Sequence, residues 1–287
     1  MMKKEIEQER DSTVYLGKRE QDLLLLLYDM LFLDMDFIHR YIFPDQVLGS
    51  VHRKVRKLED GAYIQSMMTP RVDGETAKNI KVITLNRLGV EEVDAMTGEC
   101  RWDSRWTKRT PTFIHHLLQT AKVRGALQAQ SIPEFQFQQW ISERHSYYQY
   151  GQRKEDVIVP DGTAVFRRRQ NEKEGDFIYF MEMERSRQRA TVSQNKLRRY
   201  NDYIAREAFT KHAIFSLPPV LFRVNFISAS ENEKNRLMEH TANVDTSKIQ
   251  AVMYTTYEEL LANPYGDIWS FKGSDKKYSM WRIRPEE

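Results

Sequence analysis

The order in which helical and strand-like segments follow one another in the second half of the chain constrains its fold most. A helix is predicted over residues 113–124, where apolar residues recur at helical spacing. Residues 135–141 also have strand character but stand outside the order that follows. That order is three strands at 156–159, 163–169 and 176–184, a helix at 193–208, a strand at 220–227, a helix at 231–244 and a strand at 249–255. An αβββαβ core of this kind predicts an α/β (α+β) domain with a mixed sheet.

The first half of the chain has a different pattern. A strongly apolar helix is predicted over residues 17–32, and Asp34 is the expected N-cap of a short second helix. Pro44 is expected to open a third helix over 45–58, with Val47, Val51, Val55 and Leu58 on its inner face. Strands at 62–68 and 79–85 flank a polar turn that contains Pro70, Asp73 and Gly74. Three helices followed by a two-stranded hairpin predict a winged helix-turn-helix.

Length and composition are consistent with two folded domains. The chain has 287 residues, of which 40% are hydrophobic and 30% charged. The predicted organisation is a flexible tail at 1–15, a winged helix-turn-helix at 16–93, a connector at 94–111 and a second domain at 112–287. No apolar run reaches the ~18 residues that span a bilayer, so no membrane partner is expected. Cys100 is the single cysteine, which excludes an intrachain disulfide and a cysteine-rich zinc site. These features together predict a cytoplasmic protein.

Local charge, rather than the net charge of +3, carries the signal for nucleic acid. The third predicted helix has basic residues on its outer faces, and a recognition helix reads bases with its N-terminal residues. We therefore expect double-stranded DNA as a partner, with Arg71 in the wing reaching an adjacent groove or the backbone. The predicted base contacts are Gln46 and Ser50, and the predicted contacts to phosphates or guanine edges are Arg53, Lys54, Arg56 and Lys57. The alternative is an ordinary solvated helix face.

Carboxylates in the second domain carry the strongest chemical signal. Glu182 and Glu184 lie two apart on a predicted strand, so they project to the same face. If the preceding turn, Pro160-Asp161-Gly162, brings Asp161 beside them, three carboxylates converge. A divalent cation such as Mg²⁺ or Mn²⁺ relieves their repulsion and activates water for phosphodiester hydrolysis. Lys196, on the following helix, is the candidate for electrostatic support of the transition state. The alternative is a common turn sequence beside ordinary strand-edge carboxylates.

Several segments, taken in order, resemble a known family. They are Gly17-Lys-Arg-Glu-Gln-Asp-Leu, Phe32-Leu-Asp-Met-Asp-Phe-Ile, His115-His-Leu-Leu-Gln, Val159-Pro-Asp-Gly, Tyr179-Phe-Met-Glu-Met-Glu-Arg-Ser, Lys196-Leu-Arg-Arg-Tyr, Val220-Leu-Phe-Arg-Val and Tyr254-Thr-Thr-Tyr-Glu-Glu-Leu-Leu. Over residues 16–268 the chain is similar to the plasmid-associated replication-relaxation family. The resemblance implies a winged helix fused to a restriction-endonuclease-like PD-(D/E)xK fold. It also implies a role in plasmid replication, DNA relaxation or mobilisation.

By that resemblance, Asp161 matches the aspartate of the nuclease motif and Glu182 its first acidic position. The active pattern has lysine two residues later, where this chain has Glu184. Either Lys196 substitutes from the helix, or the domain binds DNA without cutting it. Three functions follow: a DNA-binding protein of a plasmid or other mobile element with a nuclease-like domain, a metal-dependent endonuclease targeted by its winged helix, and a winged-helix transcription regulator. Replication or relaxosome proteins are further expected partners, and the leucine-rich first helix can serve either the core or a homodimer interface.

Overall fold

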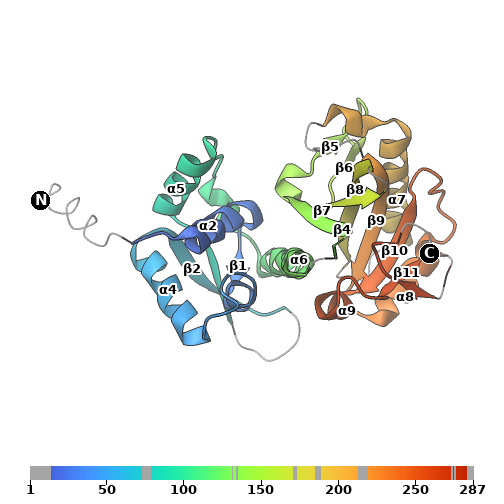
Figure 1. Cartoon of the computed structure of the whole chain (residues 1–287). Coiled ribbons are helices and arrows are strands. Elements are labelled where there is room, and N and C mark those ends of the chain that lie inside the picture. The colour runs from blue at the N-terminus through green and yellow to red at the C-terminus, as the bar shows by residue number, and fades with distance from the viewer. Residues whose placement is uncertain are drawn as a thin grey trace, which may run out of the picture. The chain divides into compact units, whose positions relative to one another are not determined.

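A computed structural model describes residues 14–72, 79–130, 132–133, 135–170, 173–184, 189–212, 219–272, 274 and 276–282. Most of the predicted tail lies outside these residues, as do Asp73 and Gly74 of the predicted wing turn. The chain divides into two compact units, residues 1–121 and 122–287, and the division falls within helix α6 (Pro111–Ala129). Figure 1 labels many of the elements of both units. Among the described residues, no helix combines the length and the apolar character needed to cross a membrane.

The first unit begins with an apolar helix and a capped turn. Helix α2 (Lys18–Met30) buries five residues, namely Leu23, Leu24, Leu26, Leu27 and Met30. Strand β1 (Leu33–Asp34) follows, and the Asp34 carboxylate accepts a hydrogen bond from the Phe37 backbone N–H at 2.8 Å. Asp34 thereby caps helix α3 (Met35–Phe37), as predicted, and the helix continues as a π-helix over Ile38–Ile42.

The rest of the first unit is a helix, a hairpin and a further helix. Helix α4 (Leu48–Asp60) precedes strands β2 (Ile64–Thr69) and β3 (Ile80–Leu85), and helix α5 (Arg87–Thr97) follows them. The two strands pair antiparallel, and β1 pairs with β3 on the other side, giving the sheet order β1-β3-β2. The 3₁₀ segment Ser104–Thr107 leads towards α6. Helices followed by a hairpin are thus found in the predicted order.

The start of the third predicted helix differs from the expectation. Pro44 does not open α4, because the helix begins only at Leu48. Residues 44–46 form a turn in which the Gln46 N–H donates to the Phe43 carbonyl at 3.1 Å, and Val47 has extended backbone as the N-cap. The prediction that Val47 lies on the inner face was therefore wrong: its side chain is 74% exposed. Val51, Val55 and Leu58 are buried as predicted.

A seven-stranded mixed sheet forms the centre of the second unit. Its order is β12-β11-β10-β9-β8-β7-β4, with β8, β9 and β10 parallel and the other neighbours antiparallel. The strands are β4 (Phe135–Ser142), β7 (Gly162–Gln170), β8 (Lys173–Glu184), β9 (Pro219–Ser228), β10 (Ala251–Thr256), β11 (Trp269–Phe271) and β12 (Lys277–Tyr278). The helical segments are α7 (Ala190–Ala205), α8 (Glu231–Thr241), α9 (Tyr257–Ala262) and the 3₁₀ turns Glu143–His145 and Ala208–Lys211.

Each face of this sheet has its own apolar packing. Leu197, Tyr200 and Tyr203 of α7 pack with Leu237 of α8 against Phe180 and its neighbours on the central strands. Side chains alternate along a strand, so Phe166 and Tyr179 lie on the opposite face. There the Phe166 ring contacts the rings of Tyr179 and Tyr265, and the Tyr265 hydroxyl donates to the Leu127 carbonyl of α6 at 2.6 Å. Parallel strands covered in this way read as nearly continuous apolar runs, which is why β9 could be recognised from sequence.

The element order α6-β4-β7-β8-α7-β9 is the predicted αβββαβ, but its first strand is a different segment. Strand β4 coincides with residues 135–141, which stood outside the predicted order, and it pairs along β7. The predicted strand at 156–159 reduces to β6 (Val157–Ile158), which pairs with β5 (Tyr148–Gln149) in a separate two-stranded sheet. Strand β6 pairs with β5, whereas β7 pairs with β4 and β8, so no hairpin closes at the predicted turn Pro160-Asp161-Gly162. The predicted last strand is also followed by two more, β11 and β12, which are too short for periodicity to reveal.

Candidate functional site

The antiparallel pairing of β7 with β8 determines where the predicted carboxylates lie. Gly162 is the register partner of Met181, so Asp161, just before β7, comes level with the end of β8. The Met183 backbone N–H donates a hydrogen bond to Asp161 Oδ2 at 2.6 Å. Glu182 and Glu184 lie on one face of β8, beside Phe226 and Ser228 of β9. All three predicted carboxylates are therefore at the same end of the sheet.

Lys196 of α7 joins the two glutamates. Its Nζ lies 2.7 Å from Glu182 Oε2 and 2.8 Å from Glu184 Oε1. The glutamate side chains are 2% and 6% exposed, and the lysine side chain is 27% exposed. The lysine is thus a partly buried cation between two buried anions, in the place the sequence proposed for it.

Tyr200 completes the contacts of Glu182 and was missed by the sequence analysis. It lies one helical turn after Lys196, so both side chains are on the same face of α7. Its buried hydroxyl donates a hydrogen bond to Glu182 Oε1. Both oxygens of Glu182 are consequently hydrogen-bonded, one to Lys196 and one to Tyr200. The i, i+4 spacing from Lys196 was the sequence signal that could have pointed to Tyr200.

Burial dominates the electrostatics of this cluster. It raises the pKa of Glu182 to about 7; the charge of Asp161 adds to this rise, while Lys196 and Tyr200 oppose it. Burial by itself would lower the pKa of Lys196, but the negative charges of Glu182, Glu184 and Asp161 outweigh it and raise that pKa above its usual value. The lysine is therefore a permanent cation, whereas Glu182 changes charge near neutral pH.

A pocket opens beside the cluster. It has a volume of about 130 Å³, and β6 and α7 supply most of its wall. Its lining residues are Val157, Ile158, Val159, Glu182, Lys196, Arg199 and Tyr200. An apolar side thus faces a side that carries two cations, a carboxylate and a phenol. Such a mixture suits a molecule with both an anionic group and an apolar surface.

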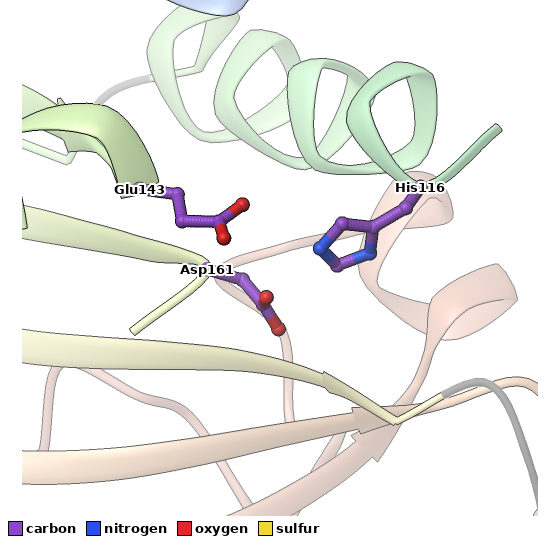
Figure 2. A group of neighbouring side chains, drawn as sticks. All are labelled: His116, Glu143 and Asp161. Atoms are coloured by element: carbon purple, nitrogen blue, oxygen red, sulfur yellow. The ribbon is translucent and has the colours of Figure 1, made fainter. Parts of the chain in front are cut away.

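A fourth carboxylate stands next to Asp161. Glu143 follows directly after β4, whose last residue, Ser142, pairs with Gly162. A carboxylate oxygen of Glu143 lies within 4.8 Å of one of Asp161, and Figure 2 shows the two side chains. Sequence reasoning missed Glu143 because the register of β4 on β7 cannot be read from a single chain. His116, also labelled in Figure 2, belongs to the first unit, whereas Glu143 and Asp161 belong to the second.

Mg²⁺ and Mn²⁺ prefer oxygen ligands, and the carboxylates fit that preference. Asp161, Glu143 and Glu182 supply such oxygens at this end of the sheet. Glu182 and Glu184 both bond Lys196, which already neutralises part of the negative charge. The site therefore suits a cation held around Asp161, with the lysine as a second, fixed positive charge.

The predicted DNA-binding residues of the first unit fall into two groups. Arg53, Arg56 and Lys57 are exposed on α4, and Arg71 is exposed just after β2. Arg56 makes a loose ion pair with Asp60 at 3.8 Å. These four cations are in contact with solvent, as contacts to a DNA backbone require.

Three others are engaged with the protein. The Lys54 Nζ bonds Glu20 Oε1 at 2.8 Å and lies 5.3 Å from the centre of the Phe43 ring. Gln46 precedes α4; its carbonyl contacts His39 Nε2 at 2.8 Å, and its side-chain oxygen is buried. Ser50 is half-buried in the first turn of the helix.

The second unit is a mixed-sheet α/β domain with a carboxylate–lysine cluster at one end of its sheet. The chain belongs to the replication-relaxation family, whose model matches residues 24–217, in agreement with the resemblance seen in the sequence. No curated protein matches it. Among solved structures it is similar to the restriction endonuclease FokI, with 10% identity and a TM-score of 0.30 over 87% of this chain and 45% of that one. For FokI bound to DNA, the values are 11% identity, a TM-score of 0.26, and 88% and 45% coverage. The chain thus spans less than half the length of these structures.

Proposed function

We propose that this protein binds double-stranded DNA through its first unit and acts in the replication, relaxation or mobilisation of a plasmid or other mobile element. The observation that carries the proposal is the exposed basic face of α4. Arg53, Arg56 and Lys57 lie opposite the buried face formed by Val51 and Leu58. A helix before a two-stranded hairpin, with its cations turned outwards, fits the docking of a winged helix in the major groove.

Lys54, next to Arg53 on α4, has a different role from the exposed cations. Lys54 bonds Glu20 and packs over Phe43, so it supports the fold. Arg53 and Lys57 extend into solvent on the outer side of the same helix. Exposed cations contribute little to the stability of a monomer, whereas they supply the salt-dependent part of DNA affinity.

Charge reversal tests this proposal. The double variant Arg53→Glu/Lys57→Glu should weaken binding to duplex DNA about tenfold for each lost phosphate contact near 0.1 M salt, and should reduce the salt slope by about two. Lys18→Glu/Arg87→Glu is the matched control, since both of its sites are exposed and lie on other helices of the unit. Fluorescence anisotropy at several salt concentrations measures both effects. Equal binding by the two double variants would remove α4 from the interface.

The carboxylate–lysine cluster favours a second candidate function, that of a metal-dependent DNA endonuclease. Asp161 and Glu182 would hold the Mg²⁺ or Mn²⁺ ion, with Glu143 beside them. The ion, when bound, activates water and neutralises charge on the scissile phosphate. Lys196 would stabilise the negative charge that develops there, and Tyr200 would orient Glu182. Lysine from the helix would thus substitute for the one that the nuclease pattern has at position 184.

Nicking of supercoiled plasmid in Mg²⁺ or Mn²⁺ separates the two functions. If the second unit is an endonuclease, Asp161→Ala and Glu182→Ala should lower nicking at least about a hundredfold, and Glu143→Ala should lower it less. Glu155→Ala, at an exposed turn position, is the matched control. A wild-type protein that cuts no substrate with either metal would leave the DNA-binding function with a non-cutting nuclease-like unit.

A further inference from the structure

The start of α4 exposes apolar side chains where the sequence predicted polar ones. Val47 is 74% exposed and Leu48 is 47% exposed, whereas the side-chain oxygen of the predicted base reader Gln46 is buried. Val47 is the N-cap, so both residues stand at the N-terminal tip of the helix. Two adjacent exposed aliphatic side chains at such a tip do not contribute to the core.

Gly49 extends this surface along the helix. Residues 49, 53 and 56 follow i, i+4, i+7 spacing, so Gly49 shares the outward face with Arg53 and Arg56. A Cβ atom at Gly49 would meet nothing within 4 Å. The fold therefore does not require glycine here, although glycine in a helix lowers its stability. What its missing side chain provides is room for another molecule to approach the backbone.

The charges around the tip define what that molecule is. Arg53, Arg56 and Lys57 border the apolar tip along α4. The nearest acid before the helix, Asp45, is ion-paired with Arg19, and Asp60 lies at the far end of α4 beside Arg56. Exposed apolar side chains beside exposed cations complement the major groove of DNA, where phosphates flank the thymine 5-methyl groups.

We propose that Val47 and Leu48 read thymine in duplex DNA through contact with its 5-methyl group, while Gly49 allows α4 to approach the bases closely. This inference rests on the proposed DNA-binding function and names the chemistry that gives it sequence preference. Arg53 and Lys57 then supply affinity, and the apolar pair supplies specificity. Specificity therefore comes from a pair that the sequence had not predicted to contact DNA, instead of from Gln46.

Uracil substitution tests the contact directly, because it removes the methyl group and nothing else. A preferred duplex is first selected from a random pool with the full-length protein. Each thymine in it is then replaced by uracil. The wild type should lose about fourfold in affinity for each contacted methyl. Val47→Ser/Leu48→Ser should bind the thymine and uracil duplexes equally. Met68→Ser, at another exposed apolar residue of the unit, should keep the wild-type discrimination.

The controls distinguish failure of this inference from failure of the proposed function. Arg53→Glu/Lys57→Glu should weaken binding to the thymine and uracil duplexes alike. If the wild type binds duplex DNA but no uracil substitution matters, thymine reading is overturned and DNA binding stands. The same holds if Val47→Ser/Leu48→Ser retains discrimination, or changes only self-association in sedimentation. If the wild type binds duplex no better than the charge-reversed variant, both proposals fail. Melting temperatures check that the exposed-site variants are folded.

Discussion

The two units use charge in opposite ways. In the second unit, Glu182 and Glu184 are buried and both are ion-paired with the partly buried Lys196. In the first unit, Arg53 and Lys57 extend into solvent from a helix that is held by its other face. Removing the cation of such a cluster leaves buried charge uncompensated and costs folding free energy, whereas removing an exposed cation costs little. Stability and function should therefore be inseparable at the cluster and separable at α4.

Removing Lys196 should give the largest effect. Lys196→Met leaves two carboxylates buried without their cation, which typically costs about 3–5 kcal/mol of unfolding free energy. Urea denaturation measures the loss. Adding Glu182→Gln and Glu184→Gln to the same chain should recover most of it, because no uncompensated charge then remains. A fall in unfolding free energy below about 1 kcal/mol for Lys196→Met would mean that water reaches the cluster. Its charges would then resemble the exposed charges of the first unit.

The pH dependence of stability should report on Glu182. Its pKa is about 7 in the folded protein, above the ordinary value of 4.5. The stabilisation that comes from its protonated form is complete below about pH 4.5 and is lost as the pH rises through about 7. Glu182→Gln carries no such charge, so its melting temperature should rise relative to that of the wild type between about pH 5 and about pH 8. Glu155→Gln, an exposed site, should show no such trend; a constant difference for Glu182→Gln would place its ionisation outside this window.

Arg53 and Lys54 are neighbours on α4, and they allow an exposed cation to be compared with one that bonds within the protein. Lys54→Ala removes the bond to Glu20 and the packing on Phe43, and should cost about 1 kcal/mol with little change in DNA affinity. Arg53→Ala should do the reverse: its stability should stay within about 0.5 kcal/mol of the wild type, and its DNA affinity should fall. Thermal denaturation and anisotropy on the same preparations measure both. If Lys54→Ala weakens DNA binding as much as Arg53→Ala, its amine leaves Glu20 for a phosphate.

Features within one helix or strand could be predicted from the sequence. Features that depend on strand register, or on where a helix begins, could not. The two-residue spacing of Glu182 and Glu184 fixed their common face, and helical spacing identified Val51 and Val55 as buried. Glu143 was missed because its approach to Asp161 depends on how β4 pairs with β7. Val47 was assigned to the core because it continues the spacing of Val51 and Val55, yet the helix starts one residue later. Residue spacing alone does not show at which residue the backbone becomes helical.

The smallest effect is expected at Gly49, and it tests whether the face of α4 is shaped for a partner. Gly49→Ala adds a methyl group that meets no atom within 4 Å, so it should raise stability by a few tenths of a kcal/mol, up to about 1 kcal/mol. Gly49→Trp should likewise leave the fold intact, since the space outside is open. Its bulk should nevertheless abolish the preference for thymine while the salt-dependent, sequence-independent binding persists. A tryptophan variant that still discriminates thymine from uracil would mean that α4 does not approach the bases along this face, and that its cations act only on the phosphates.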